Sequence, residues 1–125
     1  MAKQLAKSFN CPTEFTLSVL GGKWKTVILC YLKQQPCRYS DLRRLLPALS
    51  EKMLTERLRD LTLKGLVIHT RDSKTRSSTY SLTAKGRSLG DLLHHIYDWG
   101  RLHAKDFDVQ VGEPLTRLNE ERTAS

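Results

Sequence analysis

Cysteine and histidine are the residue types of this chain best suited to covalent or metal chemistry. The cysteines are three in number, Cys11, Cys30 and Cys37. This odd count, without a Cys-x-x-Cys pair, argues against an internal disulfide scaffold. The histidines show no spacing typical of metal ligands, and they are His69, His94, His95 and His103. We therefore expect neither a bound metal nor a cofactor.

Cys11 is the thiol whose position favours reactivity. Pro12 is well placed as the first residue of a helix, which puts Cys11 at the cap position. A helix start favours the thiolate, so the pKa of Cys11 is expected to be low. An unreactive, packed cysteine is the alternative. Either Cys30 or Cys37 could pair with Cys11 across a dimer, although we rank both below it.

The charge of the chain points to a polyanionic partner. The 125 residues suffice for one domain, and their net charge is +8. Residues 21–100 contain fifteen Lys and Arg against seven Asp and Glu, so they carry all of the net positive charge. Nucleic acid is the first candidate partner, ahead of an acidic membrane surface. Neither a membrane-spanning run nor a signal peptide is evident, which predicts a cytoplasmic protein with no membrane partner.

Helical patterns and one hairpin predict a mainly α (α+β) protein. The expected elements, in order, are a helix over 12–20, a helix starting at Lys23 and closed by Pro36, an extended link over 37–39, a helix over 41–46 capped by Ser40, a helix over 51–64 capped by Ser50, strands over 66–71 and 78–82, and one long helix capped by Thr83. Two capped helices followed by a hairpin describe a winged helix-turn-helix. We divide the chain into an arm (1–10), this domain (11–103) and a C-terminal extension or tail (104–125).

The helix over 50–64 has two chemically distinct sides. At 100° per residue, Leu54, Leu58 and Leu61 share one side, while the other is polar. Its short hydrogen-bonding side chains lie mostly in the first half of the helix, the part that enters the major groove in a recognition helix. The predicted contacts to bases and phosphates in and around this helix are Ser40, Arg43, Ser50, Lys52, Met53, Thr55, Glu56, Arg57 and Arg59. A solvated helix face with a Lys52–Glu56 ion pair is the alternative.

The hairpin loop is longer than a tight turn requires and carries several cations. Hydroxyls alternate with basic side chains over residues 71–79, so the loop could follow a phosphate backbone or enter the minor groove. The predicted contacts of this wing are Arg71, Lys74, Thr75, Arg76 and Ser77. A mobile surface turn is the alternative.

The last predicted helix has more apolar surface than a small winged domain needs to cover. Its apolar face comprises Leu89, Leu92, Leu93, Ile96 and Trp99. Such a face indicates a dimer interface. Completion of the monomer core is the alternative, and both can hold for different turns.

Several short motifs, taken together, resemble the HxlR family of bacterial winged-helix regulators. They are Cys11-Pro12, Gly21-Gly22-Lys23-Trp24, Tyr39-Ser40-Asp41-Leu42-Arg43-Arg44, Ser50-Glu51-Lys52-Met53-Leu54, Leu58-Arg59-Asp60-Leu61, Lys64-Gly65-Leu66-Val67 and the segment from Tyr80 to Arg87. The resemblance covers about residues 11–100. It implies a dimer on operator DNA, dimerisation through the C-terminal helices and the first helix, which includes Phe15, and thiol sensing at a cysteine that Cys11 matches. Family wings often carry Pro-Pro followed by Val-Glu-Tyr; here only Tyr80 remains, which predicts a more flexible and more cationic wing.

These observations predict a bacterial transcription regulator rather than an enzyme. It would bind a palindromic double-stranded operator as a homodimer and respond to a small electrophile or oxidant through Cys11. A winged helix with an architectural or protein-interaction role and no operator is the alternative. A thiol enzyme built on Cys11 is disfavoured because no paired His and Asp and no second Cys-x-x-Cys thiol accompany it.

Overall fold

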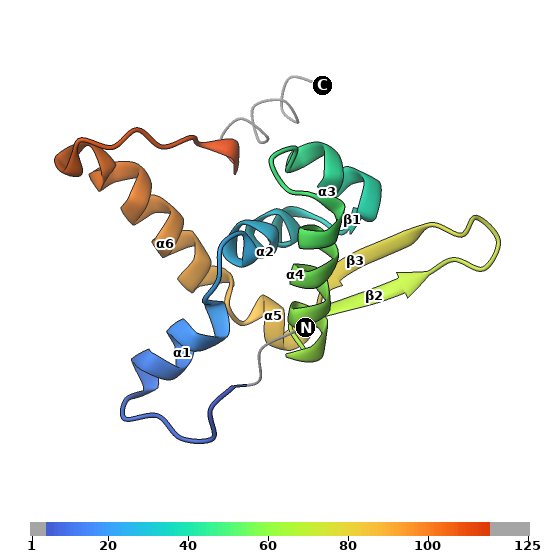
Figure 1. Ribbon diagram of the computed structural model, residues 1–125, viewed down its shortest axis with the longest axis horizontal. Coiled ribbons are helices and arrows are strands. Elements are labelled where there is room, and N and C mark those ends of the chain that lie inside the picture. The colour runs from blue at the N-terminus through green and yellow to red at the C-terminus, as the bar shows by residue number, and fades with distance from the viewer. Residues whose placement is uncertain (1–4, 116–125) are drawn as a thin grey trace.

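The computed structural model describes residues 5–115, which form a mainly helical protein with one small antiparallel sheet (Figure 1). Residues 1–4 of the predicted arm and 116–125 of the predicted tail lie outside the described residues. The elements are α1 (Pro12–Leu20), α2 (Lys25–Gln34), β1 (Cys37–Arg38), α3 (Tyr39–Leu45), α4 (Glu51–Leu63), β2 (Val67–Arg71), β3 (Ser78–Leu82), α5 (Ala84–Arg87), α6 (Gly90–His103) and the 3-10 helix η1 (Ala104–Phe107). The order confirms the predicted winged helix-turn-helix.

The wing is the β2–β3 hairpin, and it projects away from the helices (Figure 1). Its register runs from Val67 opposite Leu82 at the base to Arg71 opposite Ser78 at the loop. The two-residue strand β1 pairs with the other side of β3, which gives the strand order β1-β3-β2. The base of the wing is therefore anchored in the sheet, while its loop is free to reach outward.

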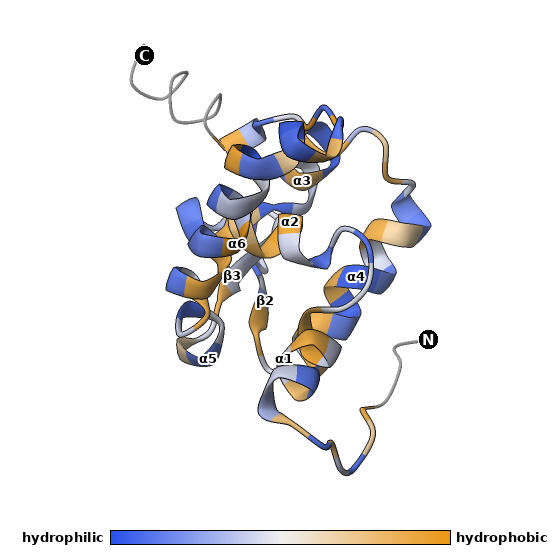
Figure 2. Cartoon of the chain, turned by 90° about the vertical axis from the view of Figure 1, so that its left-hand side faces the viewer, coloured by the Kyte–Doolittle hydropathy of each residue, from blue (hydrophilic) through white to orange (hydrophobic). Residues whose placement is uncertain are grey.

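The core is built from leucine-rich faces that converge on α2. Leucine and isoleucine side chains from α2, α3, α4 and α6 are fully buried, among them Ile28, Leu42, Leu58 and Leu93. Orange and blue alternate along the helices in Figure 2, because most of them are buried on one side only. Each buried leucine stabilises the fold by about 1.5–3 kcal/mol, so this shared core holds α4 firmly.

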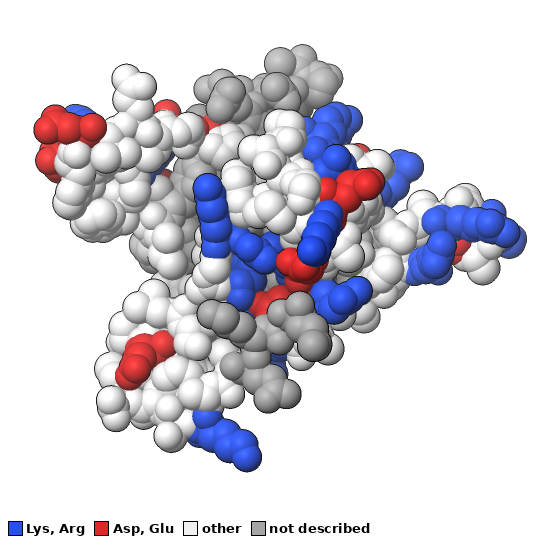
Figure 3. All heavy atoms as spheres, viewed as in Figure 1, with Lys and Arg blue, Asp and Glu red and all other residues white. Residues whose placement is uncertain are grey.

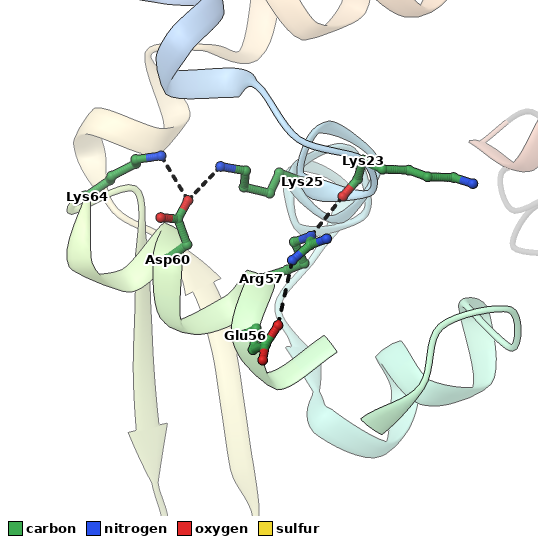
Figure 4. Close-up of polar contacts among 6 residues, drawn as sticks. All are labelled: Lys23, Lys25, Glu56, Arg57, Asp60 and Lys64. Carbon is green, nitrogen blue, oxygen red and sulfur yellow. Dashed lines mark hydrogen bonds and ion pairs between the residues drawn. The ribbon is translucent and has the colours of Figure 1, made fainter. Parts of the chain in front are cut away.

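A buried ion cluster links α2 to α4 (Figure 4). The Asp60 Oδ2 atom accepts hydrogen bonds from Lys25 Nζ at 2.7 Å and from Lys64 Nζ at 2.9 Å. The side chains of Lys25 and Asp60 are only 10% and 8% exposed. Burial lowers the pKa of Lys25 despite the attraction of Asp60. Burial by itself would raise the pKa of Asp60, but the hydrogen bonds from both lysines outweigh it, so the pKa of this carboxyl lies below its ordinary value.

Thr83 ties the last helices to the end of α4. Its hydroxyl donates to the Gly65 carbonyl at 2.6 Å and accepts from the Gly86 N–H at 3.0 Å, as predicted for a cap. A Cβ atom at Gly86 would lie 2.1 Å from the Leu66 carbonyl oxygen. Only glycine allows α5 to approach the start of the wing this closely.

Two predicted helix starts are wrong. Trp24 has φ 82°, so α2 begins at Lys25 and not at Lys23. Ser40 does not cap α3: the helix begins at Tyr39, and Asp41 accepts the Arg38 N–H at 2.9 Å, which fixes the start two residues earlier.

The single helix predicted after Thr83 is also wrong, because it is divided into α5 and α6 near Ser88. Gly86 and Gly90 flank the break, and glycine is a weak helix former. The division lets α6 leave the wing and cross α2 (Figure 1).

Beyond α6 the chain turns back toward the core. Asp108 adopts a left-handed conformation with φ 56°, and Leu115 packs against the core, where its N–H donates to the Tyr97 hydroxyl at 3.2 Å. Within the described part of the chain, no helix has the length and apolar character to span a membrane.

Replacing Asp60 with Asn should reduce the free energy of unfolding by about 3–5 kcal/mol, because two buried ammonium groups lose their counter-charge. The Asp60 pKa is depressed from its ordinary value of 3.8, so its contribution is complete above that pH and is lost as the pH falls through the folded pKa. The Asp60→Asn variant should therefore lose less stability than the wild type as the pH falls below 3.8. Urea unfolding at several pH values measures both effects.

Glu56→Gln, on the exposed side of the same helix, is the control and should change stability by less than about 0.5 kcal/mol. An equal loss of stability from both substitutions would contradict the role of the cluster.

Candidate nucleic-acid interface

The outward side of α4 is a polar surface that the core leaves free. Ser50 caps the helix by accepting the Met53 N–H at 3.1 Å, which confirms its predicted cap position. Lys52, Thr55 and Arg59 are exposed, and Glu56 is partly exposed. Neither Lys52 nor Arg59 has an ion-pair partner among residues 5–115. The carboxylate of Glu56 lies 4.0 Å from the guanidinium of Arg57 and not next to Lys52. The alternative Lys52–Glu56 pair is thus not formed.

Tyr39 is part of this surface and was missed from the sequence. Its hydroxyl donates to the Glu51 carbonyl at 3.3 Å and lies 3.2 Å from Thr55 Oγ1. Together these side chains line a shallow groove whose walls are Tyr39, Glu51, Lys52, Thr55, Glu56 and Arg59. The sequence offers no signal for this contact, because residues 39 and 55 meet only when α3 and α4 pack.

Three of the residues predicted to contact DNA also have contacts within the fold. Arg57 Nε donates to the Lys23 carbonyl at 3.0 Å, which fastens the loop before α2 (Figure 4). Arg43 Nη1 donates to the Leu49 carbonyl and closes the turn between α3 and α4. Met53 packs against the core. Contacts of these three residues with DNA stay a prediction, as does that of Ser40, which is exposed on α3.

The wing loop presents its cations from an ordered turn. Asp72 Oδ1 accepts the N–H groups of Lys74 at 2.7 Å and Thr75 at 3.3 Å, and Asp72 N–H donates to Ser77 at 3.0 Å. The Thr75 and Ser77 hydroxyls lie 2.8 Å apart. Although the wing lacks the prolines, its loop has internal hydrogen bonds of its own; greater flexibility of the wing stays a prediction. An aspartate that accepts backbone N–H groups two and three residues ahead is common in turns, so this role of Asp72 could have been predicted from the sequence.

Basic side chains gather where α4 and the wing meet solvent. Arg71, Lys74 and Arg76 are all exposed. Figure 3 shows Lys and Arg at the wing tip and over the α3–α4 region, with acidic side chains between them. The protein thus presents hydrogen-bonding groups on α4 and cations on the wing, the two kinds of group that contact bases and phosphates.

The three thiols differ in accessibility. Cys11 is exposed at the start of α1, and its pKa is lowered by hydrogen bonding from the Thr13 side chain and, less strongly, from the backbone N–H groups of Thr13 and Glu14. Cys30 and Cys37 are buried, and burial raises the pKa of both thiols. Cys11 is therefore the thiol suited to react with a dissolved reagent. No cluster of three or more potential metal ligands occurs in the described residues.

Large apolar side chains remain exposed on α1 and α6. Phe15, Ile96 and Trp99 are 45%, 44% and 57% exposed, and Leu92 is also exposed. Leu93, in contrast, is 1% exposed and belongs to the core, and Leu89 packs partly against it. These two leucines fit the alternative, in which part of the helix completes the monomer core. The other four residues remain exposed and available to a partner.

Comparison with known proteins supports a winged-helix assignment. The family model of the HxlR-like helix-turn-helix matches residues 19–108. The HTH-type transcriptional regulator YtcD of Bacillus subtilis (strain 168) is 41% identical over 98 residues, which cover 78% of each chain.

Solved structures of two regulators share the fold. The redox regulator HypR in its reduced form is 32% identical with a TM-score of 0.75, and the match covers 78% of this chain and 98% of that one. The quinone-bound YodB of Bacillus subtilis is 31% identical with a TM-score of 0.61, over 74% of this chain and 99% of that one. By sequence and by fold, this chain belongs to the HxlR-like helix-turn-helix family.

Proposed function

We propose that this protein is a transcription regulator that binds a double-stranded operator as a homodimer through α4 and the wing. The observation that carries the proposal is the outward side of α4, where Lys52 and Arg59 are exposed and have no ion-pair partner within residues 5–115. The cationic wing loop projects into solvent from the same domain. The named regulators among its relatives support the same role.

Each exposed group of α4 has a complementary partner on DNA. Arg59 and Lys52 can donate to the O6 and N7 atoms of guanine, and Glu56 can accept from a cytosine amino group. Ser50 and the free N–H groups of the first turn can hold a phosphate, which sets the depth of the helix in the groove. Thr55, close to the Tyr39 hydroxyl, has a restricted orientation, so it enters the contact with little loss of rotamer freedom.

A symmetric dimer would place two such units on one side of the duplex. The exposed apolar residues of α1 and α6 provide the surface that such a dimer would cover. A two-fold axis would set the two α4 helices about 34 Å apart, one turn of DNA, and would favour a palindromic operator.

Cys11 would connect this dimer to an electrophile or oxidant. The Phe15 N–H donates to the Cys11 carbonyl at 3.2 Å, so the thiol lies one helical turn from a residue of the proposed interface. With a quinone, the thiolate sulfur would bond to a ring carbon, the displaced electron pair would move to the oxygen, and that oxygen would take up a proton. Such an adduct would add bulk beside Phe15, change the fit of the two subunits and weaken operator binding. The likeness to quinone-bound YodB supports this class of effector.

Arg59→Ala should weaken binding to a selected operator by about 1–3 kcal/mol and leave random duplex nearly unchanged, because Arg59 is expected to read bases. The operator is obtained by selecting bound fragments from genomic DNA, and both affinities are measured by fluorescence anisotropy at several salt concentrations. Arg71→Ala is the matched control: as a phosphate contact it should weaken both duplexes alike and reduce the salt slope by about 1. Equal losses from Arg59→Ala on both duplexes, or no selected site at all, would favour the architectural alternative.

Asp72 provides a test with two opposite outcomes. Asp72→Asn keeps the Oδ1 acceptor that orders the loop and removes a negative charge beside the DNA, so affinity should rise by about twofold to fivefold. Asp72→Ala removes the acceptor, releases the loop and should weaken binding despite the same change of charge. Anisotropy titrations of both variants on one duplex measure the contrast. A gain of affinity from both substitutions would mean that only the charge of Asp72 matters.

Cys11 should react with iodoacetamide half-maximally at a pH below 9.0, the ordinary value for the thiol, because its pKa is lowered. A lowered pKa enlarges the thiolate fraction at neutral pH, so Cys11 should also react much faster than Cys30 and Cys37 in the folded protein. Peptide mass spectrometry across a pH series measures each rate, and urea-unfolded protein provides the reference. A midpoint at or above 9.0 would contradict an activated thiol, and operator binding that survives complete Cys11 modification would contradict the switch.

A further inference from the structure

A groove lies between α1 and the body of the domain, away from the outward side of α4. Its volume is about 330 Å³, within the usual range for small-molecule sites. Most of its lining is apolar, and two lysines also belong to it. The residues used below are Phe15 and Val19 of α1, Leu66, Leu89, Lys64 and Lys85.

The charges around this groove are unbalanced. Lys64 shares the single Asp60 carboxylate with Lys25, so these three groups carry a net charge of +1. Lys85 is exposed, and its ammonium group has no ion-pair partner within residues 5–115. An apolar site bordered by two cations and only one buried carboxylate is complementary to an anion with an apolar body.

From this arrangement we infer that the groove binds a small organic monocarboxylate. The apolar part of the ligand would contact Val19, Leu66 and Leu89, and its carboxylate would accept from the ammonium groups of Lys85 and Lys64. A neutral apolar molecule would leave the charge unbalanced, and inorganic phosphate would leave the apolar walls unfilled. The lining thus specifies both halves of the ligand.

The position of the groove gives the ligand a route to regulation. It is bounded by α1 on one side and by α5 and the start of the wing on the other. A ligand held there would fix α1 relative to the wing. Phe15 lines the groove and is also exposed toward the proposed partner, so occupancy of the groove and dimer geometry would be linked. The binding itself needs neither DNA nor Cys11.

The test uses the full-length protein without DNA and the probe 4-(trifluoromethyl)benzoate. Binding is measured by 19F NMR titration and compared with the neutral analogue 4-(trifluoromethyl)benzyl alcohol. The carboxylate should bind about tenfold more tightly than the alcohol, and the amide signals of Val19 and Leu89 should shift in 1H–15N spectra. Lys85→Gln should weaken carboxylate binding about threefold and leave the alcohol unaffected.

Lys74→Gln is the matched control, because it removes the same charge from the exposed wing loop. It should leave binding of both probes unchanged. Equal affinities for the two probes, or equal losses from Lys85→Gln and Lys74→Gln, would overturn the inference. Carboxylate binding that strengthens as the protein is diluted to monomers would also overturn it, because the groove would then be filled by a second copy of the chain. None of these outcomes depends on whether the protein recognises an operator.

Discussion

One buried carboxylate that binds two ammonium groups holds helix α4 in place. Asp60 lies on α4, Lys64 caps the end of that helix, and Lys25 begins α2. Leucine contacts alone would allow α4 some rotation or sliding, because apolar packing has little directional preference. Hydrogen bonds of 2.7 and 2.9 Å have a defined geometry, so they set the rotation of α4 about its axis and, with it, the direction of Arg59 and Lys52.

The basic residues of the helix-turn-helix divide into two groups with different roles. Arg43 and Arg57 donate to the backbone carbonyls of Leu49 and Lys23, and so they hold the loops around α4. Lys52 and Arg59 have no such partner among the described residues and remain available to a ligand. In the wing, Asp72 has a similar internal role, because it accepts hydrogen bonds within the loop that presents Lys74 and Arg76. Net positive charge therefore overstates the number of groups that are free to contact a polyanion.

Helix α1 is where the proposed activities meet. Its first turn carries the exposed Cys11, its outer side carries Phe15, and its inner side borders the lysine-rimmed groove. The helix has few buried residues of its own, with Leu20 the buried one at its end. An element with so little core contact is a plausible point of control, since small changes in its surroundings suffice to shift it.

The sequence by itself determined the fold class, the order of the elements, the cap at Ser50, the wing strands and the two-sided character of α4. These features depend on local rules: the period of apolar residues, the turn residues and the cap residues, all within a few positions of one another. The sequence ranked Cys11 above Cys30 and Cys37 as a reactive thiol, and only the structure shows that Cys11 is exposed while the other two are buried.

Only the tertiary structure shows which polar side chains form hydrogen bonds or ion pairs within the protein. The contacts of Arg57 with Lys23, of Lys25 with Asp60 and of Tyr39 with Thr55 join residues 34, 35 and 16 positions apart. The burial of Leu93 likewise follows from packing against the core. Helical periodicity predicts the side of a helix on which a residue lies, but not the neighbour it meets there, because that neighbour is chosen by how the elements pack.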